Sequence, residues 1–350
     1  MGETDGGRDS GERATPGTDR KGMTMRGIDR PPAEAYDVGV LDLDGVIYVG
    51  HDPVPGAAGA LEKARASGMR LAFATNNASR TPSATAALLG DVGVPAAAED
   101  VVTSAQAAAR LLAERLPAGA KVLVVGGMGL RHALRAAGLR PVSVAADKPP
   151  AVVQGYSPGL SYDLLAEGSQ AVAAGAVFVA SNGDTTIPGS GGSIRPGNGA
   201  LVQVIRTATG VDPIITGKPE LPLHRETILR TGAQRPLIVG DRLDTDIEGA
   251  YNGGADSLLV LTGVTDPRAL LAAPPRHRPT YVSADLNGLL VPHPEVRRDG
   301  TAYACGGWTV SADLDLSGEG DPMDGLRALC AAVWDSGDVE RGERALAELF

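Results

Sequence analysis

The sequence predicts an α/β protein built on a doubly wound parallel sheet. Two observations predict this fold. Short apolar runs typical of strands alternate with helix-length segments from residue 37 onward, and such alternation favours parallel pairing. Polar and acidic residues directly follow several of these runs, at the edge where open α/β sheets hold their ligands.

The expected strands are apolar runs of 3 to 10 residues, rich in Val, Ile, Leu and Ala. The run at 38–43 is bounded by Gly45, and the run at 121–125 ends at a Gly-rich stretch, as strands bounded by turns do. In chain order, we expect strands at 38–43, 69–75, 101–103, 121–125, 151–155, 176–180, 236–239, 256–260, 280–283 and 301–310.

Helices are expected in the segments between these strands. Ser104 is placed to cap one of them. In chain order, we expect helices at 57–67, 83–89, 105–116, 199–207, 223–230, 246–252, 285–290, 323–333 and 340–349. The Gly-rich stretch 126–129 lacks the G-x-G-x-x-G spacing of a dinucleotide site, so a tight turn is expected there.

Composition limits the class of protein. The chain has 350 residues, of which 43% are hydrophobic, which is enough for two or three domains. A net charge of −10 argues against nucleic-acid and membrane partners. Cys305 and Cys330 give no disulfide framework and suit a reducing compartment, so we expect a cytoplasmic protein. No apolar run approaches the length of a membrane span.

Residues 1–34 differ in composition from the rest of the chain. Gly, Thr, Asp and Arg dominate the segment, aliphatic side chains are few, and the apolar centre of a signal peptide is missing. We therefore expect a disordered tail. The sequence is compatible with a start at Met1, Met23 or Met25.

The most informative stretch is residues 36–48, which delivers Asp42 and Asp44 to the end of an expected strand. Side chains two apart on a strand share a face, so both carboxylates can point into one crevice. Such a pair resists joint ionisation and predicts a bound cation, a raised pKa, or both. A nucleophile and a proton donor together suit covalent phosphoryl transfer. A simple turn at Asp44 is the alternative, whereas a calcium loop fails because residues 46–48 are apolar.

Two further segments suit a phosphate. The strand over 69–75 ends at Thr75-Asn76-Asn77, where a hydroxyl and backbone N–H groups can cradle phosphate oxygens; a capped loop is the alternative. Lys218 lies in a Gly-Lys-Pro turn of a chain that has 27 Arg and only five Lys. Its compact ammonium suits contact with a phosphate and a carboxylate, and a solvated turn lysine is the alternative.

A second acidic cluster follows the strand over 236–239, with Asp241, Asp244 and Asp246. Carboxylates gathered at a strand end suit Mg²⁺, a hard cation that prefers oxygen ligands. Capping of the next helix by Asp244 is an additional interpretation, but it does not explain Asp241.

These residues resemble the four motifs of the haloacid dehalogenase-like hydrolases. Asp42-Leu-Asp44-Gly-Val is similar to the first motif, Thr75 to the second, Lys218 to the third, and Gly240-Asp241 with Asp246 to the fourth. The wider segments are more similar to the p-nitrophenylphosphatase/NagD branch, as in Thr75-Asn-Asn-Ala-Ser-Arg-Thr-Pro. The resemblance covers about residues 36–291 and implies a Rossmann-like core.

The resemblance implies a Mg²⁺-dependent phosphomonoesterase. In this family Asp42 would attack phosphorus and become an aspartyl phosphate, and Asp44 would protonate the leaving alkoxide and then activate water. A dehalogenase is disfavoured, because a halide needs no proton donor. The implied metal ligands are Asp42, the carbonyl of Asp44, Asp241 and, in support, Asp246. The implied phosphate contacts are Thr75, the N–H of Asn76, and Lys218.

The resemblance also implies the domain boundaries. The catalytic core would span 35–102 and 207–291, with a cap inserted at 103–206 and a small α/β appendage at 292–350. In the cap, Asn182, Asp184 and Arg195 are candidate contacts to the leaving group. The appendage resembles the acetyltransferase-like extension of glycerol-3-phosphate phosphatases from high-GC bacteria, without a pyrophosphate loop. Pairing of two copies through the cap is the assembly that we consider.

The expected substrate is a small phosphorylated metabolite, with glycerol 3-phosphate as a candidate. Two alternatives remain open. A phosphomutase has a similar first motif, but the large cap argues against it. A catalytically silent metabolite-binding or interaction module is disfavoured by the complete set of motifs.

Overall fold

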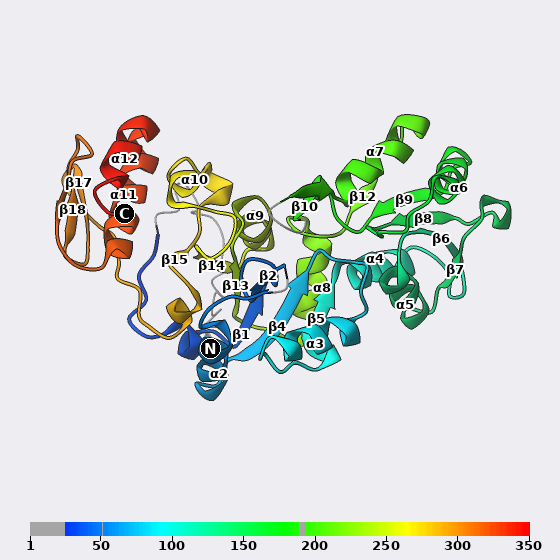
Figure 1. The fold of residues 1–350 in the computed structure, drawn as a ribbon, viewed down its shortest axis with the longest axis horizontal. Coiled ribbons are helices and arrows are strands. Elements are labelled where there is room, and N and C mark those ends of the chain that lie inside the picture. The colour runs from blue at the N-terminus through cyan, green and yellow to red at the C-terminus, as the bar shows by residue number, and fades with distance from the viewer. Residues whose placement is uncertain (1–24, 51, 189–192) are drawn as a thin grey trace, which may run out of the picture.

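The computed structural model describes residues 25–50, 52–188 and 193–350. Its main body is a six-stranded sheet in the order β15-β14-β13-β1-β4-β5, and every neighbouring pair is parallel. The strands are β1 (Val38–Leu41), β4 (Arg70–Thr75), β5 (Val101–Thr103), β13 (Pro236–Gly240), β14 (Asp256–Val260) and β15 (Tyr281–Ser283). The predicted parallel α/β fold is confirmed (Figure 1).

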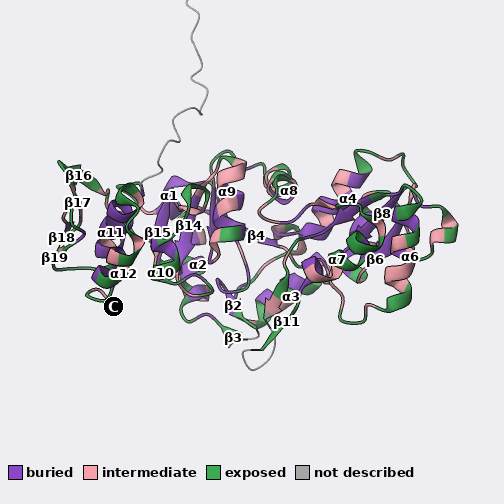
Figure 2. Cartoon of the chain, turned by 90° about the horizontal axis from the view of Figure 1, so that it is seen from above, coloured by how far each residue is buried: buried purple, intermediate pink, exposed green. Residues whose placement is uncertain are grey.

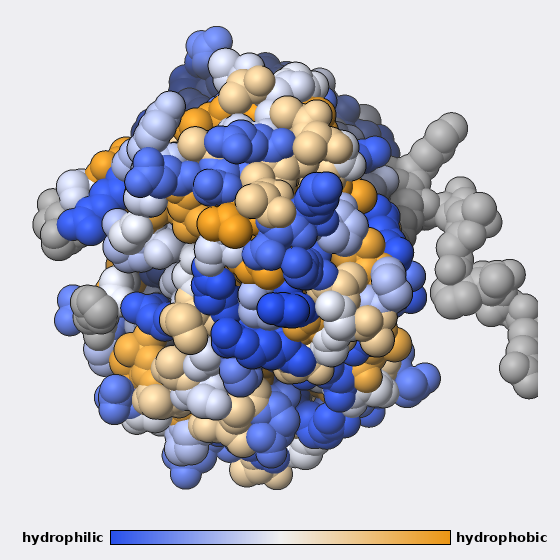
Figure 3. All heavy atoms as spheres, turned by 90° about the vertical axis from the view of Figure 1, so that its right-hand side faces the viewer, coloured by the Kyte–Doolittle hydropathy of each residue, from blue (hydrophilic) through white to orange (hydrophobic). Residues whose placement is uncertain are grey.

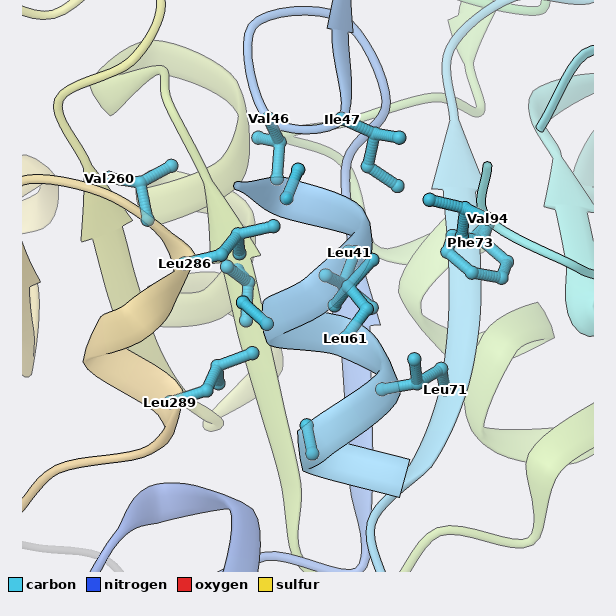
Figure 4. Close-up of a cluster of buried hydrophobic side chains, with 14 of the residues drawn as sticks. Leu41, Val46, Ile47, Leu61, Leu71, Phe73, Val94, Val260, Leu286 and Leu289 are labelled. Carbon is cyan, nitrogen blue, oxygen red and sulfur yellow. The ribbon is translucent and has the colours of Figure 1, made fainter. Parts of the chain in front are cut away.

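Helices cover both faces of this main sheet, which makes it doubly wound. They are α2 (Ala57–Ala66) and α3 (Pro82–Asp91) on one face, and α8 (Leu221–Thr231) and α9 (Glu248–Gly253) on the other. Leu61 of α2 packs with Leu41 and Phe73 of the sheet (Figure 4). Because β1 is buried on both faces, the residues that follow it start from a rigid position.

A second parallel sheet lies beside the first, in the order β12-β9-β8-β6-β7 (Figure 1). Its strands are β6 (Lys121–Val125), β7 (Arg140–Val142), β8 (Ala151–Gln154), β9 (Val177–Ala180) and β12 (Ile214–Ile215). Helices α4 (Ser104–Ala113) and α5 (Met128–Ala136) cover one face, and α6 (Tyr162–Ala173) and α7 (Asn198–Thr209) the other. We call this unit, with its helices, the inserted region.

Three expectations for the inserted region need correction. Its sheet extends to β12, beyond residue 206 where we expected it to end, because Ile214 and Ile215 pair with β9. The Gly-rich stretch 126–129 is the start of α5 as well as a turn, with Gly127 at the N-cap. The helices α5 and α6 and the strand β7 were not predicted. The structure also has two short hairpins, β2 (Tyr48–Val49) with β3 (Asp52–Pro53) and β10 (Thr186–Pro188) with β11 (Ile194–Pro196).

The C-terminal appendage is an antiparallel sheet with two helices (Figure 1). It contains β16 (Arg297–Asp299), β17 (Ala302–Cys305), β18 (Trp308–Val310), β19 (Leu316–Gly318), α11 (Pro322–Ser336) and α12 (Val339–Leu346). The single strand expected over 301–310 is wrong, because Gly306, with φ +54°, turns the chain into a hairpin. Residues of α11 share one apolar cluster with Leu259 and Val282 of the main sheet.

The expected disordered tail is wrong for residues 25–34, whereas residues 1–24 lie outside the described part of the chain. Met25 is buried in the cluster beneath the appendage, Ile28 bridges to His293, and α1 (Pro32–Ala35) follows. A few apolar side chains thus suffice to anchor a polar segment. Within the described residues, no helix has the length and apolarity needed to cross a membrane.

Buried residues concentrate in the two parallel sheets and in α11 (Figure 2). The face at the inserted-region end mixes hydrophilic and hydrophobic residues (Figure 3). Among the described residues, the remaining helices are α10 (Pro267–Leu271), a π-helix over Leu243–Ile247 that carries Asp244 and Asp246 and leads into α9, and short turns at 98–100, 145–147, 275–277 and 286–289. The last of these is a 3₁₀ turn in place of the helix expected over 285–290.

Candidate active site

The predicted site residues converge at the carboxyl ends of three adjacent strands. Asp42 directly follows β1, Thr75 ends β4, and Asp241 directly follows β13, and β1 lies between the other two. The backbone N–H of Asp42 donates to the carbonyl of Val239 (2.8 Å). This bond extends the ladder by one residue and fixes Asp42 relative to Asp241.

Lys218 reaches this edge from the inserted region, just after β12. Its Nζ lies 2.5 Å from Oδ1 of Asp42 and 2.6 Å from Oδ1 of Asp246, and it also donates to the carbonyl of Ala74 (3.2 Å). Burial alone would lower the pKa of Lys218, but the Asp246 and Asp42 carboxylates outweigh it and raise the pKa. The side chain is therefore a fixed ammonium, and the solvated turn lysine is excluded.

Asp42, Asp241 and Asp246 form a candidate metal centre. Each offers a carboxylate oxygen, and these oxygens lie within 4.8 Å of one another. Burial, above all, raises the pKa of both Asp241 and Asp246, and Oδ1 of Asp241 is buried without a hydrogen-bond partner. With all three carboxyl groups ionised, as metal ligands are, the cluster and the Lys218 ammonium together carry two negative charges. A divalent cation that prefers oxygen ligands fits this cluster in both charge and donor set.

Glycines make room for the buried carboxylates. A Cβ on Gly45 or Gly263 would overlap the carboxylate of Asp241, and a Cβ on Gly240 would overlap Asp246. Gly45 also has φ +82°, in the left-handed region that glycine adopts without strain. Side chains at these positions would therefore displace the candidate metal ligands.

The sequence analysis missed one wall of the site, which follows β14. The N–H of Val264 donates to Oδ2 of Asp241 (2.7 Å), and Oγ1 of Thr262 donates to the carbonyl of Gly45 (2.6 Å). Gly263 lies between them. A signal was present, because a Thr-Gly pair closely follows a predicted strand, but neither residue carries a titratable group.

Asp44 lies on the solvent side of Asp42. It is exposed, and its Oδ1 accepts from the N–H of Gly50 (3.4 Å). Burial, followed by the charges of Asp44 and Asp42, raises the pKa of Tyr48, so both carboxylates lie close to one phenol. This exposure allows Asp44 to exchange protons with solvent.

The loop after β4 uses its side chains differently from the prediction. Oγ1 of Thr75 accepts from the N–H of Asn77 (3.1 Å), which is the capped loop of the alternative interpretation. The carboxamide of Asn76 bonds the Lys218 main chain at both groups: Oδ1 accepts from its N–H (2.7 Å), and Nδ2 donates to its carbonyl (3.1 Å). The phosphate contacts of Thr75 and of the Asn76 N–H stay predictions.

Two of the three residues proposed for the cap lie at the site. Nδ2 of Asn182 donates to the Asn76 carbonyl (2.6 Å), and the Asp184 carboxylate accepts from Nδ2 of Asn76 at 3.2 and 3.3 Å. Burial raises the pKa of Asp184. Arg195 instead lies on the exposed strand β11, and no ion pair joins it to the aspartates among the described residues.

A cavity of about 270 Å³ lies between the inserted region and the main sheet. Asp184 and Thr185 line it from one side, and Lys218 and Arg242 from the other. Arg242 is held by Asp244 through two hydrogen bonds of 3.1 and 2.8 Å. The volume suits a small molecule.

Known proteins resemble this chain in sequence and structure. Residues 39–140 match the family described as haloacid dehalogenase-like hydrolase, residues 215–289 a HAD-hydrolase-like family, and residues 305–349 a GCN5-related N-acetyltransferase-like domain. The D-glycerol 3-phosphate phosphatase of Mycobacterium tuberculosis is 42% identical over 325 residues, 90% of each chain.

Solved structures agree with these sequence matches. A crystal structure of the glycerol phosphate phosphatase of Mycobacterium tuberculosis in complex with magnesium is similar with a TM-score of 0.80 and 40% identity, over 92% of this chain and 100% of the other. A thermostable NPPase from Geobacillus stearothermophilus is similar with a TM-score of 0.65 and 31% identity, over 72% and 97%. The second match leaves out about a quarter of this chain.

Proposed function

We propose a specific function for this chain, which belongs to the haloacid dehalogenase-like hydrolases and is a phosphoric monoester hydrolase. It would hydrolyse a small phosphorylated metabolite through an aspartyl phosphate on Asp42. Glycerol 3-phosphate is the first candidate, because a relative 42% identical to this chain is named for that substrate. The observation that carries the proposal is the contact of Lys218 with Asp42 beside two further buried carboxylates.

The reaction would proceed in two displacements on phosphorus. An Oδ atom of Asp42 attacks the phosphorus, the new O–P bond forms, and the bond to the alkoxide oxygen breaks. Asp44, protonated, gives its proton to that alkoxide. Asp44 then takes a proton from water as the resulting hydroxide attacks the phosphorus, which releases inorganic phosphate and regenerates the Asp42 carboxylate. Lys218 contacts the Asp42 carboxylate and offers its charge to the phosphoryl oxygens.

Mg²⁺ is the cofactor that we propose for the carboxylate cluster. Asp42, Asp241 and Asp246 would hold it, with the carbonyl of Asp44 as a further ligand. When bound, the cation supplies positive charge against the phosphoryl group and the carboxylates. The orphaned Oδ1 of Asp241 and the net charge of the cluster support this assignment.

The inserted region would select the leaving group. Asp184, Asn182 and Arg195 are the proposed contacts to the leaving group, and Thr75 with the N–H of Asn76 would hold the phosphate.

We further propose that the protein is cytoplasmic, since both cysteines are unpaired. We also propose that two copies pair through the inserted region, where Tyr162 exposes 80% of its surface. Sedimentation at several protein concentrations tests the pairing.

The proposed function is tested by measuring phosphate release from p-nitrophenyl phosphate, glycerol 3-phosphate and a panel of small phosphate esters. We expect turnover with Mg²⁺, none after exhaustive chelation, and none for Asp42→Asn with an unchanged fold by circular dichroism. Release of phosphate by a metal-free enzyme, or by Asp42→Asn at the wild-type rate, would contradict the mechanism. Absence of turnover on every ester would contradict the function.

A further inference from the structure

We propose that the carboxamide of Asn76 is a positioning residue that couples the placement of Lys218 to the placement of the inserted region. The proposal rests on the proposed function, because it concerns the lysine of that site. Asn76 itself belongs to the main sheet's loop after β4, and it contacts both the lysine segment and the Asn182–Asp184 segment.

Every hydrogen-bonding group of the Asn76 carboxamide has a partner in this junction. Its oxygen accepts from the Lys218 N–H, one amide hydrogen reaches the Lys218 carbonyl, and the other reaches the Asp184 carboxylate. An amide offers one acceptor and two donors in a fixed plane. The Lys218 main chain and Asp184 therefore take positions that one rigid group sets.

The Asn76 main chain reinforces this arrangement from the inserted region. Its carbonyl accepts from Nδ2 of Asn182 (2.6 Å) and from Oγ of Ser104 (2.7 Å), where α4 begins. Oδ1 of Asn182 in turn accepts from the N–H of Asp184 (3.2 Å). Both chain crossings between the two parallel sheets, near Ser104 and near Lys218, are thus bonded to the same residue.

Glycine at position 217 is what permits the close approach. A Cβ on Gly217 would overlap Oδ1 of Asn76 and the carbonyl of Ser181. The lysine segment can therefore come within hydrogen-bond distance of the carboxamide only when its preceding residue has no side chain. This is an independent sign that the chain is built to bring Asn76 and Lys218 together.

The contacts of Asn76 determine where the Lys218 ammonium lies. Nζ of Lys218 touches Asp42 and Asp246 only if its main chain stays in place. Movement of the inserted region that pulls on Asp184 would act through Asn76 on the lysine main chain. The backbone N–H of Asn76 is the group proposed to hold the phosphate, whereas the Asn76 carboxamide contacts no reacting atom and acts through Lys218.

The first test detects the hydrogen bond from the Lys218 N–H to Oδ1 of Asn76, and it needs no substrate. The chain has only five lysines, so ¹⁵N-lysine labelling of the full chain gives few amide signals, and Lys218→Arg identifies the one of interest. We expect the Lys218 amide to be protected from hydrogen exchange in the wild type and to exchange at least about tenfold faster in Asn76→Ala. Equal protection in the two proteins would overturn the positioning role, whatever the enzyme hydrolyses.

The second test exchanges the donor and the acceptor of the hydrogen bond between the Asn76 amide and the Asp184 carboxylate. Asn76→Asp places two carboxylates face to face, so we expect kcat/KM for p-nitrophenyl phosphate to fall about 100-fold. Asp184→Asn alone also removes a proposed leaving-group contact, and it is measured to give the cost of that change by itself. In Asn76→Asp/Asp184→Asn, the new amide donates to the new carboxylate, and we expect about a tenfold recovery. Thermal unfolding temperatures of these variants should agree closely.

A matched control is Asn252→Asp. Nδ2 of Asn252 donates to the carbonyl of Pro219 (3.0 Å), beside Lys218, and among the described residues no hydrogen bond joins the Asn252 side chain to the inserted region. We expect Asp184→Asn to give no recovery in this background. Additive effects of Asn76→Asp and Asp184→Asn would overturn the coupling. Absence of activity in the wild type would instead refute the proposed function and leave the exchange result as the test.

Discussion

Nζ of Lys218 lies 2.5 Å from Oδ1 of Asp42, although the two residues are 176 positions apart in the chain. Asp42 belongs to the main sheet, whereas Lys218 returns from the inserted region. The ion pair therefore closes the junction between the two parallel sheets at the point where chemistry is proposed. Each partner is only about one-eighth exposed, at 12% and 13%, so solvent screens their attraction weakly.

Replacing the lysine by methionine should remove the charge and keep the length of the side chain. We expect Lys218→Met to lower phosphate release by at least about 100-fold, because the nucleophile and the phosphoryl oxygens lose their cation. Lys218→Arg should not restore the rate, since a planar guanidinium does not match a point contact. Lys63→Met, at an exposed position of α2, is the control. Activity of Lys218→Met close to that of Lys63→Met would contradict the assigned role.

Asp44 should matter according to the leaving group. With glycerol 3-phosphate, Asp44→Asn should cost about 100-fold or more, because the alkoxide leaves without a proton donor. With p-nitrophenyl phosphate the burst of nitrophenol should suffer less than steady turnover, which still needs the base. Rapid-mixing kinetics measure both phases, and Asp52→Asn, exposed on β3, is the control. An equal loss in the burst for both esters would exclude Asp44 as the proton donor.

Gly263→Ala should weaken Mg²⁺ binding although Gly263 is not a ligand. The new methyl group would push against the Asp241 carboxylate, and disturbance of residues that support metal ligands typically costs about 10- to 100-fold in affinity. Titration calorimetry with Mg²⁺ measures this directly. Gly59→Ala, where an added Cβ meets open space in α2, should bind like the wild type. Unchanged affinity in Gly263→Ala would remove Asp241 from the metal centre.

His293 should make the stability of the chain depend on pH. Burial, followed by the Arg327 cation, lowers the pKa of His293 from 6.5 to about 4. Below pH 6.5 the unfolded chain binds a proton that the folded chain refuses, so stability is lost as the pH falls from 6.5 toward 4. The loss from this residue approaches about 3 kcal/mol. Urea unfolding of wild type and His293→Gln across this range measures it, and parallel curves would contradict the assignment.

The alternating pattern predicted the main sheet well because its strands are continuous apolar runs buried on both faces. The site residues could be predicted for the same reason. Asp42, Thr75 and Asp241 lie at the ends of such runs, so the sequence shows which strand end each one occupies. The helix α6 was missed, and only three of its twelve residues, Gly168, Ala171 and Val172, are buried. Tertiary packing decided that element.

Contacts between distant segments could not be derived from local pattern. Nothing near Asn76 indicates that its carboxamide bonds the main chain 142 residues later. Gly263 and Val264 support Asp241 through backbone and lack of bulk, which leave no chemical mark in the sequence. The ordered structure around Met25 and Ile28 likewise depends on partners near the other end of the chain.

β15 is an edge strand of the main sheet, and the appendage covers it. Nη2 of Arg327, from α11, donates to the outward carbonyl of Val282 (2.6 Å), and α11 packs its apolar residues against the same strand. An exposed edge of this kind would offer unpaired carbonyl and N–H groups to any other extended chain. The appendage thus protects the protein against edge-to-edge aggregation, and a chain cut after residue 291 would be prone to assemble through β15 even with every catalytic residue in place.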